Sequence, residues 1–197
     1  GVTNKDLNQK EFIQLDSKTI DISTYAKAFT LKKILKKYRL KKVITFHSFL
    51  KSASVFSDLL NELKLNANFI SGYHNIRERK QLIKKLEKKS DNVEILSNAK
   101  VLSEGIDLPE LDCIAFIDPK TSVVDIVQAV GRAIRASKDR KKIGYIVIPI
   151  YLDNNSGFET IYKTIIAMRS HDARMAEELD NFRIKIGNGT NLSNLKL

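Results

Sequence analysis

The sequence predicts an α/β domain with a mostly parallel central sheet and a helical extension at its C-terminal end. Between residues 23 and 150, short apolar runs of strand length alternate with longer segments in which apolar residues recur at helical spacing. Strands that alternate with helices favour parallel pairing through right-handed crossovers. A chain of 197 residues with 43% hydrophobic content can bury one such domain with appendages.

The first elements of this pattern lie before residue 100. Residues 1–22 are polar and mixed, and we expect an extended lead-in from a preceding domain. Helices are expected over about 23–39, 48–63 and 75–89, each with apolar side chains on one face. Strands are expected at 42–47, 68–71 and 93–97, where the sequence is apolar over a short run.

The second half continues with a strand at 112–117 and a helix that begins near Ser122, where Ser122 and Asp125 have the spacing of a capping box. The apolar run 143–150 predicts a last strand. After a polar loop at 151–157, a long helix is expected to reach about residue 182. The chain is thus divided into a lead-in (1–22), an α/β domain (23–150), a helical extension (151–186) and a mobile tail or linker (187–197).

The segment from Gln128 to Arg135 carries the strongest functional signal. As a helix, it places Gln128, Arg132 and Arg135 on one face, with apolar side chains on the other. Gly131 removes a side chain beside Arg132, so that a ligand can approach the backbone. Two guanidiniums on one rigid face suit the spread negative charge of a phosphoryl group. Taken alone, the segment favours an amphipathic surface helix whose arginines are solvated.

A loop earlier in the chain strengthens this signal. It follows the strand-like run at 93–96, is punctuated by Gly105 and Pro109, and leads into the apolar strand at 113–117. Such a loop emerges at the end of a strand, where open α/β sheets bind ligands. Gly105 leaves room for a close approach of the backbone, and Asp107 offers an acceptor suited to ribose hydroxyls.

With these two segments in this order, the chain resembles the second (C-terminal) RecA-like domain of superfamily 2 helicases and translocases. Residues 102–109 are similar to motif V, and residues 128–135 are similar to motif VI. Residues 43–48 resemble motif IV, and Ser71-Gly72 with Arg79 resembles the strand and loop that follow it. The resemblance covers roughly residues 40–150, and residues 167–174 are similar to restriction-type and plasmid- or phage-borne DNA translocases.

The resemblance implies a RecA-like three-layer fold and assigns roles to individual residues. Arg132 and Arg135 are implied as arginine fingers, with Gln128 relaying between the nucleotide and the nucleic acid. The implied nucleotide-binding residues are Glu104, Gly105, Asp107 and Gly131. The implied nucleic-acid contacts, at loops after the strands, are His47, Ser48, Ser71, Gly72, Arg79, Ser97, Asn98 and Lys100.

The sequence departs from a complete motor in one respect. It has no Gly-x-x-x-x-Gly-Lys-Ser/Thr phosphate loop, and no acidic pair follows a strand in a way that could hold Mg²⁺ for such a loop. ATP and Mg²⁺ are therefore expected to be held mainly by an N-terminal RecA-like domain of the same parent chain. On its own, this chain is expected to be inactive as an ATPase.

The charge of the chain points to a polyanionic partner. Its 34 basic and 23 acidic residues give a net charge of +11, which favours nucleic-acid binding that weakens steeply with salt. Lysines cluster over residues 32–42 and 77–89, although most of them are expected to be simply solvated. DNA is favoured over RNA because of the restriction-type resemblance.

The composition of the chain argues against disulfide-rich, metal-binding and membrane-spanning proteins. The single cysteine, Cys113, lies in an apolar strand, so no disulfide framework exists and a reducing cytoplasm is expected. His47, His74 and His171 lack the spacing of zinc ligands, so no metal site is expected, and no apolar run has membrane-spanning length. Two alternatives stay open: a non-catalytic RecA-like nucleic-acid-binding or scaffold module, and a domain that binds only protein.

Overall fold

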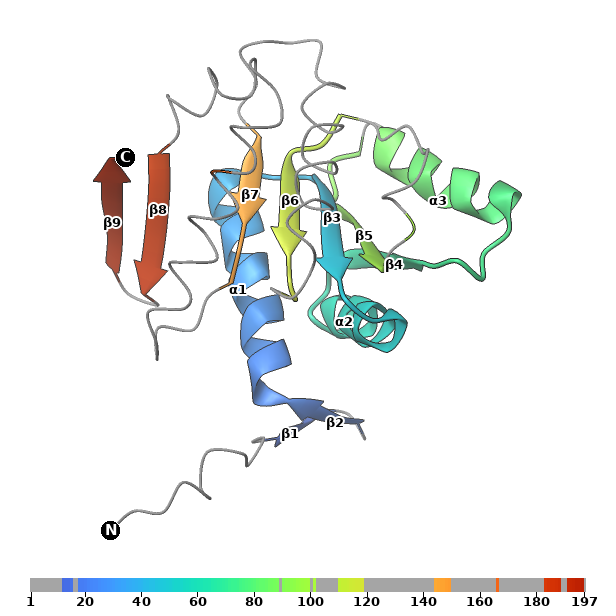
Figure 1. Cartoon of the computed structure of the whole chain (residues 1–197), viewed down its shortest axis with the longest axis horizontal. Helices are drawn as coiled ribbons and strands as arrows, with labels where there is room; N and C mark the ends of the chain where they lie inside the picture. The colour runs from blue at the N-terminus through green and yellow to red at the C-terminus, as the bar shows by residue number, and fades with distance from the viewer. Residues whose placement is uncertain are drawn as a thin grey trace.

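A computed structural model of the chain describes residues 12–15, 18–88, 90–99, 101, 110–118, 144–149, 166, 183–188 and 191–196. Five strands form its central sheet, and each pairs with its neighbours in the parallel direction (Figure 1). In spatial order they are β4 (Asn66–Ile70), β5 (Glu94–Ala99), β3 (Lys42–His47), β6 (Cys113–Phe116) and β7 (Tyr145–Val147). The predicted α/β fold with a mostly parallel sheet is confirmed.

Helices cover both faces of this sheet, namely α1 (Ile22–Tyr38), α2 (Leu50–Glu62) and α3 (Ile76–Glu87). Because successive side chains of a strand point to opposite faces, Val43 and Ile44 of β3 belong to different layers. Val43 joins the core cluster that α1 and α2 complete with Leu31 and Phe56. Helix α3 buries Ile83 and packs against β4 and β5 from the other side. Within the described ranges, no helix combines the length and apolar character needed to cross a membrane.

The ends of the helices follow from local sequence. The carboxylate of Asp21, just before α1, accepts the backbone N–H of Ser23 at 3.0 Å. Helix α1 ends at Arg39, which adopts the left-handed conformation with φ of 55°. Asn75 and Glu78 form a reciprocal capping box at the start of α3. These bounds agree closely with the predicted helices.

The chain before α1 differs from the extended lead-in that the sequence predicted. Strand β1 (Phe12–Leu15) pairs in the antiparallel direction with β2 (Lys18–Asp21). Asp16 and Ser17 separate the two strands in the sequence, and both residue types favour tight turns. A hairpin therefore stands where an extended lead-in was expected.

The C-terminal end also differs from prediction. The helical extension was expected to continue to residue 186 and a mobile tail or linker to follow, but β8 (Arg183–Asn188) pairs in the antiparallel direction with β9 (Asn191–Lys196). Because Asn188 pairs with Asn191, only Gly189 and Thr190 separate the two strands in the sequence, and a glycine in the first position of a two-residue loop is a hairpin signal that the prediction overlooked. Most of the expected extension, and the helix expected from Ser122, lie outside the described residues.

Candidate functional site

The carboxyl ends of the central strands bring polar residues from separate chain segments to one edge of the sheet. His47 ends β3, Ser71 directly follows β4, and Asp118 comes shortly after β6. Parallel strands place such residues together because they all end at the same edge. The side chains of His47 and Ser71 are only 2% and 1% exposed, so this edge has a buried polar interior.

A chain of hydrogen bonds begins between β5 and β3. Thr45 and Ser97 are register partners, and their hydroxyl oxygens lie 3.0 Å apart. The Thr45 oxygen also lies 3.0 Å from Nε2 of His47, two residues further along β3. The three side chains share one face because they occupy alternate strand positions. Thr45 and Ser97 have no exposed surface, so they replace water as partners for one another.

The other ring nitrogen of His47 continues this chain toward β6. Its Nδ1 lies 3.2 Å from the hydroxyl oxygen of Ser52, in the first turn of α2. The Ser52 hydroxyl donates to Oδ2 of Asp118 at 2.9 Å, and the backbone N–H of Ser48 donates to the same oxygen at 3.0 Å. The complete set, which we call the carboxyl-edge relay, consists of Ser97, Thr45, His47, Ser52 and Asp118.

The environment of His47 keeps its imidazole neutral. The pKa of His47 is lowered from 6.5 to about 4, chiefly by burial; the Asp118 carboxylate opposes this shift, and the charge of Lys27 contributes to it. That carboxylate lies 3.8 Å from Nδ1. The ring also packs against Phe56, with 5.1 Å between ring centroids. At neutral pH, His47 therefore acts as one hydrogen-bond donor and one acceptor.

The loop after β4 is held by hydrogen bonds within its own segment. Nδ1 of His74 accepts the backbone N–H of Ser71 at 3.0 Å. Arg79, in the first turns of α3, reaches back and donates to the carbonyl oxygens of Gly72 at 2.7 Å and His74 at 2.8 Å. The side chain of Tyr73 is 88% exposed at the tip of this loop. The loop is thus held by hydrogen bonds and exposes the aromatic ring of Tyr73.

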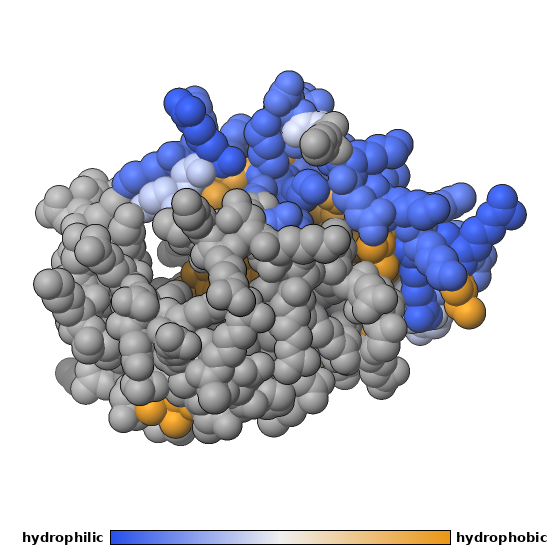
Figure 2. All heavy atoms as spheres, turned by 90° about the horizontal axis from the view of Figure 1, so that it is seen from above, coloured by the Kyte–Doolittle hydropathy of each residue, from blue (hydrophilic) through white to orange (hydrophobic). Residues whose placement is uncertain are grey.

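Helix α3 presents a row of positive charge beside this loop. The residues Arg77, Lys80, Lys84 and Lys88 are all exposed. Their helical spacing places them on one side of α3, so they form a continuous basic row. Figure 2 shows hydrophilic side chains gathered at the end of the molecule where α3 lies. The row runs from the carboxyl edge of the sheet toward the opposite edge.

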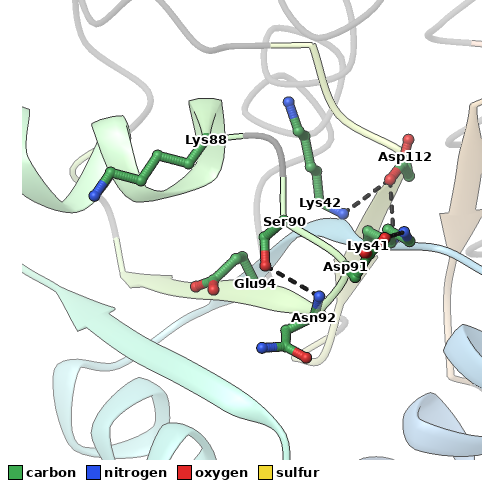
Figure 3. A pocket seen from close by; sticks show the side chains of 8 residues that line it. All are labelled: Lys41, Lys42, Lys88, Ser90, Asp91, Asn92, Glu94 and Asp112. Carbon is green, nitrogen blue, oxygen red and sulfur yellow. Dashed lines mark hydrogen bonds and ion pairs between the residues drawn. The ribbon is translucent and has the colours of Figure 1, made fainter.

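A polar hollow of about 360 Å³ lies at that opposite edge (Figure 3). It is lined by Lys41, Lys42, Lys88, Ser90, Asp91, Asn92, Glu94 and Asp112. Asp112 accepts the backbone N–H groups of Lys41 and Lys42, both at 2.9 Å. The hydrogen bond from Lys41, at 2.8 Å, holds the pKa of Asp91 below its ordinary value. Lys41 and Asp91 pair with one another in this hollow, and Asp112 joins the start of β3 to the segment before β6.

The residues predicted from the sequence fall into two groups. Those predicted to contact nucleic acid, except Lys100, gather around the carboxyl edge, although Ser97 and Asn98 lie inside β5 and not in a loop after it. Strand β5 continues to Ala99 because Asn98 remains in register with Ile70 of β4. The remaining predicted residues lie outside the described part of the chain: Lys100, Glu104, Gly105, Asp107, Gln128, Gly131, Arg132 and Arg135.

Burial changes how the predicted contacts can act. The side chains of His47, Ser71, Ser97 and Asn98 are at most 2% exposed, and Oδ1 of Asn98 accepts the backbone N–H of Val101 at 3.1 Å. Within this domain, these side chains therefore support the edge from inside. Their predicted contact with nucleic acid stays a prediction, and Gly72 is the exposed member of the group beside the partly exposed Ser48 and Arg79.

Sequence reasoning missed three members of the relay, Thr45, Ser52 and Asp118. A weak signal existed for each of them. Thr45 is a polar residue within an apolar strand, Ser52 opens a helix just after a strand, and Asp118 ends an apolar strand before a proline. None of these signals indicates which residues become partners, because that depends on the register of β3 with β5 and β6.

The chain matches a known protein family and several known proteins. A family model described as the helicase conserved C-terminal domain matches residues 26–137. UvrABC system protein B from Kosmotoga olearia is 34% identical over 90 residues, which are 43% of this chain and 13% of that protein. DEAD-box ATP-dependent RNA helicase 27 from Oryza sativa subsp. japonica is 29% identical over 115 residues, 58% of this chain and 19% of that protein.

Among solved structures, the chain is similar to the ATP-dependent Type ISP restriction-modification enzyme LlaBIII bound to DNA. The two are 30% identical, with a TM-score of 0.63, over 82% of this chain and 13% of that chain. The chain spans less than a fifth of the length of the curated relatives it matches. The expected RecA-like fold and the expected similarity to superfamily 2 helicases, including a restriction enzyme, are both confirmed.

Proposed function

This chain belongs to the family of the helicase conserved C-terminal domain, and we propose that it is the second motor domain of an ATP-dependent superfamily 2 translocase or helicase. In this role it closes on an ATP-bound N-terminal RecA-like domain of the same parent chain. It supplies arginine fingers to the nucleotide and surface contacts to a nucleic-acid strand. Opening after hydrolysis then shifts the domain along the strand.

The observation that carries this proposal is the organised carboxyl edge of the sheet. The matched family region contains the ends of β3, β4, β5 and β6, and the structure joins three of these strands through the carboxyl-edge relay. Ligands of open α/β sheets bind outside this edge. A purely structural edge has little need for a chain of five polar side chains, three of which (Thr45, His47 and Ser97) are buried, because apolar packing would stabilise it as well.

The nucleotide half of the proposal rests on residues of the matched family region that follow β5 and β6 in sequence. Arg132 and Arg135 would meet the phosphates of ATP, and Gln128 would relay between the nucleotide and the strand. Glu104, Gly105 and Asp107 would lie at the ribose, with Gly131 allowing close approach. Guanidiniums and small loops fit a nucleotide, whereas the Mg²⁺ and the phosphate loop would belong to the N-terminal domain. Bound ATP supplies the phosphoryl transfer that drives the motion.

The nucleic-acid half uses the loops after β3, β4 and β5. Gly72 and the backbone near Ser48 would meet phosphates, and Arg79 would hold the loop that makes one of these contacts. The basic row of α3 would add attraction that is independent of sequence. We propose DNA as the track because the similar restriction-modification enzyme was solved bound to DNA, although RNA helicases are also among the relatives.

The proposal is tested by the ATPase activity of the full-length protein with and without DNA and RNA, compared with its Arg132→Ala variant. We expect one polymer to stimulate turnover and the substitution to reduce turnover by about a thousandfold or more while ATP binding persists. Arg39→Ala, at the exposed end of α1, is the matched control and should retain turnover. Unchanged turnover in Arg132→Ala would remove the arginine-finger role.

A second measurement tests whether this chain binds nucleic acid by itself but needs the N-terminal domain to hydrolyse ATP. The 197-residue chain should bind polynucleotides with strong salt dependence but hydrolyse no ATP. Hydrolysis by the chain alone would overturn the proposal that its partner domain holds the phosphates. If the full-length protein binds polynucleotides without ATP turnover, the chain is a non-catalytic RecA-like module. If the full-length protein shows neither polynucleotide binding nor ATP turnover, a domain that binds only protein is left.

A further inference from the structure

One aromatic side chain is almost fully exposed at the carboxyl edge of the sheet. Residues 71–74, which directly follow β4, form a β-turn in which the backbone N–H of His74 donates to the carbonyl oxygen of Ser71 at 3.2 Å. We call this segment the Tyr73 turn. Tyr73 lies at its third position and is 88% exposed. The fold therefore gains little stability from this ring, since the ring is hardly removed from water.

Hydrogen bonds hold the Tyr73 turn in place although its tip is exposed. Nδ1 of His74 accepts the backbone N–H of Ser71 at 3.0 Å, which closes the turn a second time. Arg79 donates to the carbonyl oxygens of Gly72 at 2.7 Å and His74 at 2.8 Å, so the turn is also tied to α3. A ligand that meets the tip thus meets a preorganised ring, and binding costs little conformational entropy.

The space beside the ring is open. A Cβ atom placed on Gly72 would meet no heavy atom within 4 Å. Ile76, the first residue of α3, is 72% exposed, so two large apolar side chains close together in the sequence are left to solvent. An aromatic ring with free space over its face can stack on another planar ring.

The charge beside the Tyr73 turn indicates what kind of ring this is. Helix α3 follows the turn directly, and residues 76–88 contain six basic and two acidic residues. Arg77 and Lys80 of the basic row are exposed and lie in the first turns of the helix, nearest to Tyr73. A polyanion that also carries planar rings fits both features. Single-stranded nucleic acid is such a ligand, with a phosphate and a base at every position.

We propose that Tyr73 stacks on an unpaired base of the nucleic-acid track, while Arg77 and Lys80 meet the adjoining phosphates. This inference rests on the proposed function, and it adds a contact to a base where the contacts proposed above go to phosphates. Stacking is tolerant of sequence because every base has a π-face. It directs this end of the domain to single-stranded DNA, since the faces of paired bases are covered by their neighbours in a duplex.

The stacking is tested by fluorescence anisotropy of the 197-residue chain with two labelled strands of equal length. One is an oligothymidylate, and the other is an abasic strand with the same phosphates but no bases. The chain should bind the oligothymidylate about tenfold more tightly. Tyr73→Ala should remove this difference by weakening only the binding of the oligothymidylate, with no change in melting temperature. Tyr73→Phe, which keeps the ring, should bind both strands as the unaltered chain does.

Two controls separate stacking from electrostatic attraction. Lys80→Ala removes a charge and keeps the ring, so it should weaken the binding of both strands by the same factor and reduce the salt slope by about 1. Tyr73→Ala removes no charge and should leave the salt slope unchanged. A DNA duplex of the same length is the third ligand, and Tyr73→Ala should not change the affinity for it.

The possible outcomes separate the stacking from the proposed function. Equal binding of the oligothymidylate and the abasic strand by the unaltered chain, or a loss in Tyr73→Ala that extends to the abasic strand or the duplex, would overturn the stacking and leave the motor intact. Unchanged binding of all three ligands by Tyr73→Ala would also overturn it and point to a protein partner for the turn. If the unaltered chain binds none of the three, the nucleic-acid half of the proposed function is overturned and the stacking with it.

Discussion

Arg79 donates from Nη2 to the carbonyl oxygen of Gly72 at 2.7 Å, and so fastens the loop after β4 to the helix that follows it. Its Nε also donates to the carbonyl of His74. A lysine has one ammonium group and lacks the planar fork that serves both carbonyls. We therefore expect Arg79→Lys to lower the free energy of unfolding by about 1 kcal/mol in urea titrations. Arg77→Lys, on the same helix, is the control, and equal effects of the two substitutions would contradict this role.

The basic row of α3 predicts a measurable electrostatic effect on polynucleotide binding. Replacing Lys80 and Lys84 by alanine removes two charges from adjacent turns. If each contacts one phosphate, affinity falls and the slope of log K against log salt decreases in magnitude by about 2. Fluorescence anisotropy with labelled DNA over a salt series measures both quantities.

The control for this experiment keeps the same change in net charge. Lys33 and Lys37 have the same spacing on α1 and are also exposed. Their replacement by alanine should leave the salt slope nearly unchanged if binding is confined to the carboxyl edge and α3. Equal slopes in the two double variants would show that only the overall charge of the chain matters.

The lowered pKa of His47 predicts that the domain loses stability in mild acid. Its value is about 4 in the folded state against 6.5 in the unfolded state, so the unfolded chain binds more protons between these limits. Stability is therefore complete above pH 6.5 and falls as the pH drops toward 4. At pH 4.5 the loss should be about 2–3 kcal/mol relative to pH 7.

This prediction is checked by urea unfolding at both pH values, alongside the His47→Gln variant. Glutamine does not titrate, so the variant should lose the part of the pH dependence that His47 contributes. Carboxylates titrate in both proteins, and their effect cancels in the comparison. An identical pH dependence in the two proteins would mean that His47 is more accessible to protons than its burial indicates.

Cys113 should be chemically inert while the domain is folded. Its thiol is 1% exposed within β6, and burial raises its pKa to about 12, with the Asp112 carboxylate adding to the effect. The reactive thiolate is therefore scarce and shielded. Alkylation at pH 8 should be slow in the native protein and rapid in urea, and mass spectrometry resolves the two rates. Rapid native labelling would indicate that the centre of the sheet opens readily.

The sheet could be predicted because its inner strands are continuous apolar runs that alternate with amphipathic helices. The family resemblance also pointed to His47 and Ser71 at the ends of their strands, and both lie at the carboxyl edge. The relay could not be predicted in the same way. Thr45 meets Ser97, and Ser52 meets Asp118, across separations of 52 and 66 residues, and such pairings depend on strand register. The hairpins near the two ends of the chain were not predicted, because the polar composition of these segments favoured a lead-in and a tail or linker over tight turns.

The position of β3 in the middle of the sheet has a consequence for how the domain folds during its synthesis on the ribosome. Both partners of β3 come later in the chain, since it pairs with β5 and then with β6. When β3 leaves the exit tunnel it has no strand to pair with, and β4, the next strand made, joins the sheet only through β5. Such non-local pairing delays folding. The nascent domain must therefore wait for Phe116 before its central strand is enclosed on both sides.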